Sequence, residues 1–333
     1  MKITQTTIFG EPKLKIRNRK SKNKNGLKFF KPTEENFESI IDDLENIHKR
    51  TRFTVGLSGG KDSVSTAHKL DQMGKLDSCF HIKTNIGIQK TTDFVQELCD
   101  DMGWKLHIVE PQPKFVYVAF CLQYGFPTGD FHRLIMGYLK YHSMRNFALT
   151  LDKKNHCIIS GVRKFESERR FGNYPEPIQT DGSVWWGCPR FYDTTEEVYR
   201  DVHENGLRIT PIHEILGFSG ECMCGSYATA GQKQQIRDID PKLADFIEWI
   251  EVGVSKFGTN QAKSHAKWGG YSKMSDLEKQ QTLKQFFEDN PDLEIVNDIE
   301  KLVCGDECGA GIFLSDTCNY CNGEGKWNQA AQS

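Results

Sequence analysis

Short apolar runs and amphipathic segments alternate between residues 53 and 161 of the chain. The apolar runs predict strands, and the segments with apolar residues at helical spacing predict helices. Such alternation favours an α/β fold in which helices cover both faces of a parallel sheet of about five strands. The predicted strands are 53–57, 79–84, 105–109 and 157–161, and the predicted helices are 62–73, 90–102 and about 131–149.

Amphipathic helices are also predicted outside this region. One of them, at 34–49, precedes the first strand and carries apolar residues on one face, so it is expected to cover the core. Helical patterns at about 231–256 and 275–288 predict a helical connector towards the C-terminus.

The composition narrows the class of protein. The chain has 333 residues, enough for an α/β core and a smaller appendage. Its formal net charge of −2 gives the chain as a whole no strongly basic character. It contains no run of about 18 apolar residues that would predict a membrane span, and its first residues lack the apolar core of a signal peptide. We therefore expect a cytoplasmic protein without a membrane partner, in which disulfides are rare.

One segment departs from this balanced charge. Residues 13–31 contain nine Lys and Arg and no acidic residue. Two interpretations stay open: a solvated, flexible arm, or a contact with a polyanion such as tRNA or DNA.

The loop between the first predicted strand and the next helix reads Ser58-Gly-Gly-Lys-Asp-Ser63. Gly59 and Gly60 let the backbone approach an anion at a helix N-terminus, where free N–H groups and the helix dipole attract negative charge. Lys61 adds a full positive charge, and the two serines add hydroxyl donors. The spacing excludes a Walker A loop, which has four residues between its first Gly and the Gly-Lys pair.

With its flanks, this hexapeptide resembles the pyrophosphate loop (PP-loop) of the adenine-nucleotide alpha-hydrolase superfamily. That superfamily includes ATP pyrophosphatases, ATP sulfurylase small subunits and phosphoadenosine phosphosulfate (PAPS) reductases. The resemblance implies that an adenine nucleotide binds here, either ATP or a sulfonucleotide (PAPS or adenosine phosphosulfate, APS). Lys61 would then face its phosphates, while Asp62 could hold Mg²⁺ or cap the helix.

Two later segments are expected beside this loop, because ligands of open parallel sheets bind at the carboxyl ends of the strands. Asn85 and Gly87 follow the strand 79–84 and resemble the turn that lines the adenosine pocket in the superfamily. The loop after 157–161 resembles the Gly-x-Arg-x-x-Glu/Gln-Ser-x-x-Arg motif of PAPS reductases. Arginines there would clamp phosphate or sulfate oxygens. The matching residues are Gly161, Arg163, Glu166, Ser167 and Arg169.

Weaker candidates and a continuation of the resemblance accompany these motifs. His132, Arg133 and Lys140 lie near the predicted helix 131–149 and are further candidates for the same pocket. The resemblance extends to about residue 228, through a Thr-capped helix near 193–202 and a cysteine-bearing loop.

Four cysteines near the C-terminus have the spacing of metal ligands, C-x3-C-x9-C-x2-C. Two close pairs joined by a short loop predict a tetrahedral thiolate site, for which Zn²⁺ is the usual metal. The alternative is four reduced thiols without a metal. The four residues are Cys304, Cys308, Cys318 and Cys321.

Cys222 and Cys224 are separated by one residue, which would place both thiols on one side of an extended loop. Three interpretations stay open: a 4Fe–4S cluster with Cys188 as a third ligand, a redox-active or persulfide-carrying pair, and a second half of the C-terminal metal site. The four cysteines inside apolar segments are expected to be core residues: Cys79, Cys99, Cys121 and Cys157.

The chain departs from PAPS reductases at one motif. Those enzymes end in Glu-Cys-Gly-Leu/Ile-His, whose cysteine attacks the sulfonyl sulfur. Here Glu307-Cys308-Gly309 lacks the histidine, and Cys308 lies within the apparent zinc spacing. Because a zinc-bound thiolate is a poorer nucleophile, this departure argues against reduction by Cys308.

Three functions follow from the resemblance. The first is ATP-dependent adenylation of a substrate with pyrophosphate release, coupled to sulfur transfer or nucleic-acid modification. In it Lys61, Asp62 and Arg163 would act on the phosphates, and Cys222 or Cys224 would take sulfur from a donor protein. The second is a sulfonucleotide reductase that releases sulfite with a thioredoxin-like partner. The third is a non-catalytic nucleotide- or nucleic-acid-binding subunit.

The expected organisation has four parts. They are a basic N-terminal arm (1–32), a PP-loop adenine-nucleotide-binding domain (33–228), a helical connector (229–303) and a four-cysteine metal-binding module (304–325).

Overall fold

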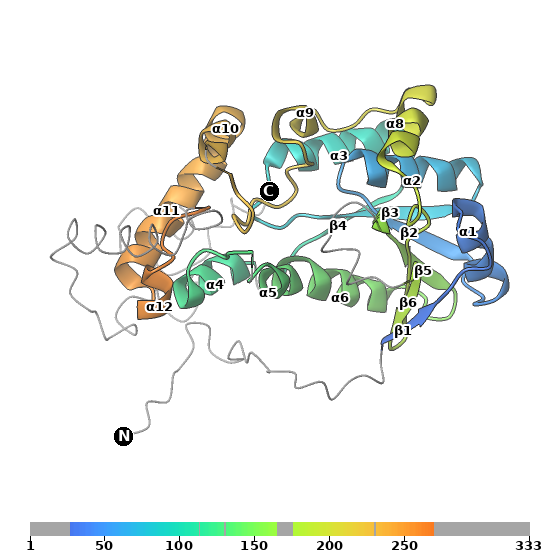
Figure 1. Ribbon diagram of the computed structural model, residues 1–333, viewed down its shortest axis with the longest axis horizontal. Coiled ribbons are helices and arrows are strands. Elements are labelled where there is room, and N and C mark those ends of the chain that lie inside the picture. Colours follow the sequence, from blue (N-terminus) through green and yellow to red (C-terminus); the bar gives the residue numbers. More distant parts are fainter. Residues whose placement is uncertain (1–26, 113, 130, 165–175, 230, 270–333) are drawn as a thin grey trace, which may run out of the picture.

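The computed structural model describes residues 27–112, 114–129, 131–164, 176–229 and 231–269 (Figure 1). Several sequence predictions lie outside the described residues. They are most of the basic run 13–31, the helix at 275–288, three residues of the second motif (Glu166, Ser167 and Arg169), and the metal-ligand candidates Cys304, Cys308, Cys318 and Cys321.

The described residues contain one mixed sheet of seven strands. These are β1 (Leu27–Phe30), β2 (Arg52–Gly56), β3 (Leu76–Ile82), β4 (Leu106–Val109), β5 (His156–Ile159), β6 (Ile178–Asp181) and β7 (Val184–Gly187). Their order is β1-β6-β7-β5-β2-β3-β4. The strands β7, β5, β2, β3 and β4 pair in parallel, whereas β6 is antiparallel to both of its neighbours.

The α/β class is confirmed, and five of the strands are parallel, as expected. The described sheet nevertheless has seven strands, because β6 and β1 extend it with antiparallel pairing. The four predicted strands correspond to β2, β3, β4 and β5. The missed strands β1, β6 and β7 lie outside residues 53–161, in which strands and helices alternate, and β6 and β7 form a hairpin without a helix between them. Gly182, with φ +63°, lies in the two-residue turn between β6 and β7, where this conformation favours glycine.

Helices cover both faces of the sheet (Figure 1). Phe53 and Val55 of β2 belong to an apolar cluster with residues of α1, α2 and α3 on one face. On the other face, Phe80 and Ile158 cluster with Ala148 of α6. The helices are α1 (Phe37–Asn46), α2 (Lys61–Gln72), α3 (Gln89–Met102) and α6 (His142–Thr150).

The helix predicted at 131–149 is divided into three. Helix α5 (His132–Met136) passes into a π-helical stretch, η1 (Gly137–Tyr141), and then into α6. A π-helical turn is typical of functional sites, because it redirects the side chains that follow it.

A third apolar cluster lies to one side of the sheet. It contains residues of α4 (Val116–Tyr124), α10 (Gln232–Ile239), α11 (Pro241–Phe257) and α12 (Asn260–Lys263). The helical pattern predicted at about 231–256 is confirmed, and the structure divides it into two helices. The chain breaks at Asp240 before Pro241, which lacks the N–H that a continuing helix needs. The Asp240 side chain caps the new helix at the Leu243 N–H.

The remaining described helices are α8 (Thr195–Glu204) and α9 (Ile212–Leu216). The predicted Thr-capped helix is confirmed: Thr194 and Glu197 form a reciprocal capping box at the start of α8. The prediction that Cys79, Cys99, Cys121 and Cys157 are core residues is also confirmed, since all four are buried. Within the described ranges, no helix is both long and apolar enough to span a membrane.

Candidate functional site

The loop Ser58–Ser63 leaves β2 at the carboxyl end of the parallel strands and enters α2. Gly59 has φ +78°, and a Cβ there would lie 3.2 Å from the Val95 side chain. Its carbonyl also accepts a hydrogen bond from the Thr210 N–H at 2.8 Å. Glycine is therefore required at this position both by conformation and by space.

The start of α2 has the features of an anion site. The Ser63 hydroxyl lies 3.1 Å from the Ser58 hydroxyl and donates to the Gly60 carbonyl at 3.0 Å, which shapes the loop. Gly60 is the N-cap residue, and no side chain caps the helix. The first N–H groups of α2 therefore remain available to a ligand, together with the positive end of the helix dipole.

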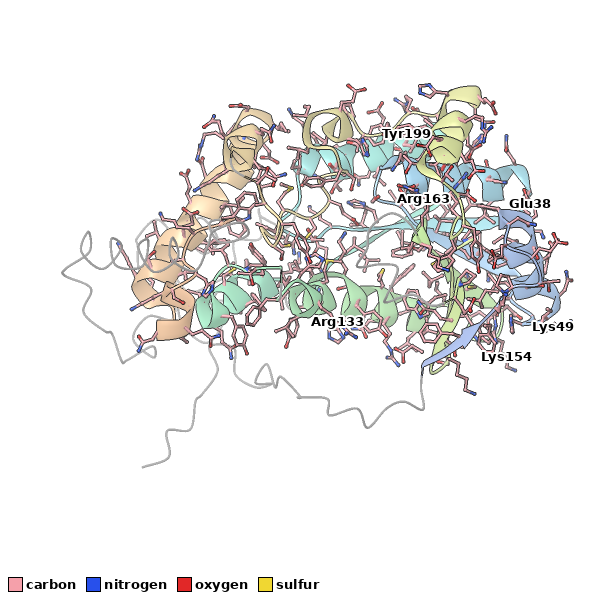
Figure 2. All side chains as sticks on the ribbon, in the orientation of Figure 1. Glu38, Lys49, Arg133, Lys154, Arg163 and Tyr199 are labelled. Carbon is pink, nitrogen blue, oxygen red and sulfur yellow. The ribbon has the colours of Figure 1, made fainter. Side chains whose placement is uncertain are left out.

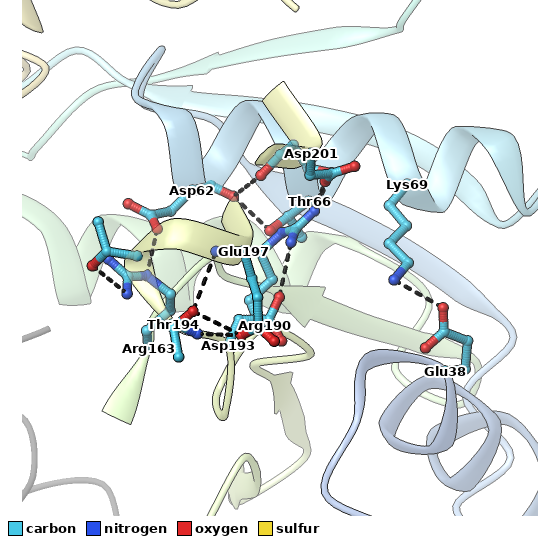
Figure 3. A network of polar contacts seen from close by, with 12 residues as sticks. Glu38, Asp62, Thr66, Lys69, Arg163, Arg190, Asp193, Thr194, Glu197 and Asp201 are labelled. Carbon is cyan, nitrogen blue, oxygen red and sulfur yellow. Dashed lines mark hydrogen bonds and ion pairs between the residues drawn. The ribbon is translucent and has the colours of Figure 1, made fainter. Parts of the chain in front are cut away.

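Asp62 joins two cations at this helix start, and Figure 3 shows its contact with one of them, Arg163. Its Oδ2 lies 2.8 Å from the Lys61 Nζ, and its Oδ1 accepts from the Arg163 Nε at 2.6 Å. The Arg163 side chain is only 3% exposed and also donates to the Thr195 hydroxyl at 3.1 Å. The carboxylate thus holds a lysine and an arginine in one arrangement beside the open helix end.

The close approach of the two segments depends on Gly161. A Cβ at this position would lie 2.7 Å from the Asp62 backbone. Without a side chain at Gly161, the loop after β5 can reach the start of α2 and deliver Arg163 two residues later. The structure thus brings Gly161 and Arg163 to the PP-loop, as the order of the motifs predicts, while their roles in ligand binding remain predictions.

The sequence did not point to Arg190 as a residue that organises the site. It is 2% exposed and pairs with Asp193 and Asp201, and its guanidinium donates to the Ser65 carbonyl in α2 at 3.1 Å. These bonds fasten α8 to the PP-loop helix (Figure 3). In the sequence, Arg190 follows a cysteine and a proline, and this pattern does not predict a buried arginine with several ion pairs.

Two further residues near Lys61 were also missed. The Tyr199 ring on α8 lies 5.5 Å from the Lys61 Nζ. Burial and, after it, the positive charge of Lys61 lower the pKa of His213, whereas Asp62 opposes this shift. His213 is therefore a neutral imidazole in the field of the PP-loop cation.

The predicted adenosine turn lies against the cysteine loop. Asn85 has φ +60°, in the left-handed region that asparagine tolerates. A Cβ at Gly87 would lie 2.3 Å from the Glu221 carbonyl oxygen, so only glycine allows this contact. A role of Asn85 and Gly87 in binding adenosine remains a prediction, and the observed contact of Gly87 is with the backbone beside Cys222.

Hydrogen bonds fasten this turn to residues 219–223, which together with 224–226 we call the thiol loop. Both backbone and side-chain groups take part, on both sides of Gly87. The bonds run from the Ile88 N–H to Gly220 O (2.9 Å), from the Met223 N–H to Ile86 O (2.7 Å), from Thr84 Oγ1 to Glu221 O (2.7 Å) and from Thr91 Oγ1 to Ser219 O (2.6 Å).

The two thiols of this loop interact with each other. A hydrogen bond from the Cys222 thiol holds the pKa of Cys224 well below its usual value, with smaller contributions from His132 and Ser226, although burial opposes it. The same bond, followed by burial, raises the pKa of Cys222 well above its usual value. The Ser226 hydroxyl lies 3.3 Å from the Cys224 sulfur. The pKa of Cys224 is therefore the lower of the two.

A buried ion pair accompanies the thiols. Lys140, in the π-helical stretch, pairs with Glu221, and their side chains are 18% and 11% exposed. Burial would lower the pKa of Lys140, but Glu221 and Cys222 raise it above its usual value. Lys140 was a candidate for the phosphate pocket, and the structure places it beside the thiols instead.

The thiol loop is anchored through its backbone. The Tyr117 hydroxyl donates to the Cys224 carbonyl at 2.8 Å, and the Trp268 indole N–H donates to the Met223 carbonyl at 2.8 Å. A Cβ at Gly225, which has φ +86°, would lie 2.8 Å from the Trp268 ring. The thiols are therefore held in place by residues from α4 and from the segment after α12.

The described residues contain no group of three His, Cys, Asp or Glu side chains arranged to hold a metal ion. Cys188, the suggested third ligand, is buried and lies in the electrostatic neighbourhood of Cys157 in the sheet. A 4Fe–4S cluster at Cys222 and Cys224 therefore stays a prediction that would need ligands from elsewhere in the chain.

Asp62 does not cap α2, which was one of the two roles suggested for it. Both of its carboxylate oxygens face cations, Lys61 and Arg163. Mg²⁺ takes oxygen ligands, among them carboxylates and nucleotide phosphates. Its binding at Asp62 remains a prediction.

The sequence of the chain matches a known family and a curated protein. The model of the family "Phosphoadenosine phosphosulfate reductase domain" matches residues 52–219, just over half of the chain. A curated relative is the tRNA-5-methyluridine(54) 2-sulfurtransferase of Pyrococcus horikoshii, 37% identical over 73 residues. That match covers 21% of this chain and 23% of the relative, so the chain matches less than a quarter of the relative's length.

Similar solved structures are more distant in sequence. PAPS reductase from Candida auris, in a phosphate complex, is 13% identical, with 55% of this chain and 85% of that chain covered and a TM-score of 0.41. NMN synthetase from Francisella tularensis is 14% identical, with coverages of 81% and 99% and a TM-score of 0.35. The family match confirms the resemblance seen in the sequence motifs. The chain belongs to the PAPS reductase domain family and is a PAPS reductase-like member of the PP-loop class.

Proposed function

We propose that this chain binds ATP at the PP-loop and transfers its adenylyl group to a substrate oxygen, releasing pyrophosphate. One observation carries the proposal: Asp62 holds Lys61 and Arg163 together beside the uncapped start of α2. Two cations and a row of free N–H groups are what a polyphosphate requires.

The chemistry follows from this arrangement. A substrate oxygen attacks the α-phosphorus, and the bond from that phosphorus to the oxygen bridging to the β-phosphorus breaks. The electron pair leaves with pyrophosphate, and the substrate proton passes to solvent. Lys61, Arg163 and the helix N–H groups stabilise the negative charge that develops on the departing pyrophosphate.

The thiol loop supports a second step, sulfur transfer. The outer sulfur of a persulfide carried on one cysteine of the Cys222–Cys224 pair would attack the carbon that bears the adenylated oxygen, and AMP would leave with that oxygen. The other cysteine would then break the S–S bond of the resulting mixed disulfide, which frees the thiolated substrate and leaves a Cys222–Cys224 disulfide. A thioredoxin-like dithiol would reduce this disulfide. The hydrogen bonds between the thiol loop and the turn at Gly87 support coupling of the two steps. The curated relative named a tRNA sulfurtransferase supports a nucleic-acid acceptor, and the sulfur would come from a donor protein.

The test uses the full chain with Mg-ATP, with and without bulk tRNA, and measures pyrophosphate. We expect pyrophosphate to form only when tRNA is present. Lys61→Ala should abolish it, whereas Lys69→Ala should not. Lys69 lies on the same helix and pairs with Glu38 at its surface, so it is a matched control. Equal rates in the two variants would contradict the assignment of the site.

Sulfonucleotide reduction is the second candidate, and the family match with the adjacent thiol pair favours it. PAPS and a thioredoxin-like dithiol replace ATP and tRNA in the same assay, and sulfite is measured. Sulfite without pyrophosphate would select the reductase. If neither product forms while ATP still binds, the chain is a non-catalytic nucleotide-binding subunit.

A further inference from the structure

A group of six cations lies around β1 and before β2 and β5, and the amino ends of β2 and β5 are opposite to the PP-loop. Two of them precede β2, two precede β5, and two lie in or beside β1. We call this group the cationic rim, and it consists of Lys28, Lys31, Lys49, Arg50, Lys153 and Lys154.

Arg50 holds two parts of the rim together. Its Nη1 donates to the Lys153 carbonyl at 2.7 Å and also bonds the Lys154 carbonyl. Its guanidinium carbon lies 4.8 Å from the centre of the Trp185 ring. The segment before β2 and the segment before β5 are therefore fixed against each other, and Figure 2 shows Lys49 and Lys154 at the same end of the molecule, away from Arg163.

The first strand joins the same surface. Phe30 stacks on Trp185 with ring centres 5.3 Å apart, and His48 contacts both rings. Lys28 lies two residues before Phe30 and therefore on the same face of β1. Through the register of the sheet, Lys28 is opposite Thr180, which is opposite Trp185. Lys28 and Lys31 are also the last two cations of the basic run 13–31.

The rim has an excess of positive charge. Among the described residues, none of its six cations forms an ion pair, whereas Arg52 and Lys75 near the same end of the sheet do. Asp152 is the carboxylate next to Lys153, and its oxygens accept from the Lys154 and Asn155 nitrogens. All five lysines of the rim are exposed, so their charges face solvent around a half-buried aromatic group.

We propose that the cationic rim binds the sugar–phosphate backbone of a nucleic acid. Closely spaced cations without acidic partners attract a chain of phosphates, and their binding releases condensed counterions. Trp185, Phe30 and His48 add ring surfaces of the kind on which bases or riboses pack.

The position of the rim suits a polymer more than a small anion. Arg50 and Ser58 lie at opposite ends of β2, a strand whose five residues span roughly 17 Å. A folded RNA or a duplex is large enough to contact the rim and the PP-loop at the same time. The rim would then hold a substrate for the proposed reaction, although its binding does not depend on that reaction.

The test measures binding of the full chain to labelled bulk tRNA and to a short duplex DNA over a range of salt concentrations. The variant is Lys49→Gln with Lys153→Gln and Lys154→Gln. Its matched control places the same three changes at Lys90, Lys242 and Lys256, which are exposed on other helices. We expect the rim variant to bind about tenfold or more weakly, with a shallower dependence on salt, and the control to bind like the parent chain.

The outcomes separate the possible explanations. Weaker binding of tRNA alone assigns the rim to RNA, and weaker binding of both polymers assigns it to the backbone that they share. Equal affinities of the rim variant and the control would overturn the proposal. If the chain binds polyglutamate as tightly as tRNA, and the rim variant loses affinity for both equally, the proposal is overturned in favour of an acidic protein as the partner.

Failure of the rim and failure of the proposed function are also distinguishable. Lys61→Ala should lose ATP binding and keep tRNA binding, while the rim variant should do the reverse. ATP affinity thus serves as the check that the rim variant is folded.

Discussion

The PP-loop and the thiol loop differ in what holds them in place, although each contains a buried ion pair. In the PP-loop, Asp62 and Lys61 are neighbours in the sequence, and only Arg163 comes from another strand. In the thiol loop, Lys140 and Glu221 are 81 residues apart. The first site is largely a local motif, whereas the second exists only once the fold has formed.

The two regions are nevertheless continuous. The turn at Gly87 is hydrogen-bonded to the thiol loop, and the Gly59 carbonyl accepts a hydrogen bond from Thr210, which precedes the thiol loop by about nine residues. A change at either loop is therefore expected to be felt at the other. The following variants test this comparison, beginning with the largest expected effect.

Removal of the Arg163 side chain should cost the most. The guanidinium is 3% exposed, and its loss leaves the Asp62 carboxylate with Lys61 alone. We expect Arg163→Ala to lower the free energy of unfolding by about 3 kcal/mol or more. Urea denaturation measures it. Arg208→Ala, at a side chain that is 47% exposed, should cost less than about 1 kcal/mol. Similar costs for the two variants would contradict the buried arrangement.

Lys140→Met tests the ion pair of the thiol loop. It leaves Glu221 buried without its cation, so we expect a loss of about 2–3 kcal/mol in the free energy of unfolding, somewhat less than for Arg163 because Lys140 is 18% exposed. The double variant Lys140→Met with Glu221→Gln should recover most of this loss, because no unpaired charge remains. If the double variant is instead less stable than Lys140→Met, the ion pair is not the stabilising contact.

Gly87→Ala tests the connection between the regions. The added Cβ would lie 2.3 Å from the Glu221 carbonyl, so the turn and the thiol loop must move apart. We expect a loss of about 2 kcal/mol and faster alkylation of Cys222 and Cys224. Gly137→Ala is the control, since the nearest atom there is 4.0 Å away. Unchanged alkylation rates would show that the loops are not coupled.

Acidification should produce the smallest effect, spread over the molecule. Burial lowers the pKa of four histidines below 6.5, so the unfolded chain binds more protons than the folded chain as the pH falls through this range. The free energy of unfolding should therefore decrease between about pH 7.5 and about pH 5.5. Urea midpoints at the two values measure it, and a higher midpoint at the lower pH would contradict these shifts. The histidines are His48, His107, His156 and His213.

The sequence predicted those parts of the fold and of the site that depend on local patterns of residues. Alternating apolar runs predicted β2 to β5, and glycines next to Lys61 and Arg163 predicted two segments that do meet. It was insufficient for the short hairpin β6–β7 and for β1, which was assigned to the basic arm. Those strands are stabilised by pairing with each other and with the sheet, which no periodicity records.

The sequence also did not predict the roles of residues whose partners are distant along the chain. The partners of Arg190 are Asp193, Asp201 and a carbonyl in α2, and the spacing of these residues in the sequence matches no known motif. Lys140 was assigned to the phosphate pocket because of its charge alone. Its placement beside Cys222 depends on the π-helical stretch, which the helical pattern of 131–149 does not show.

The most direct test of the account is a calorimetric titration of pyrophosphate into the parent chain, Lys61→Ala and Lys69→Ala. The account predicts that the parent and Lys69→Ala bind pyrophosphate with equal affinity, while Lys61→Ala loses most of it, because Lys61 and Arg163 together face the open start of α2. Equal binding by all three proteins would contradict the claim that this loop is the phosphate site.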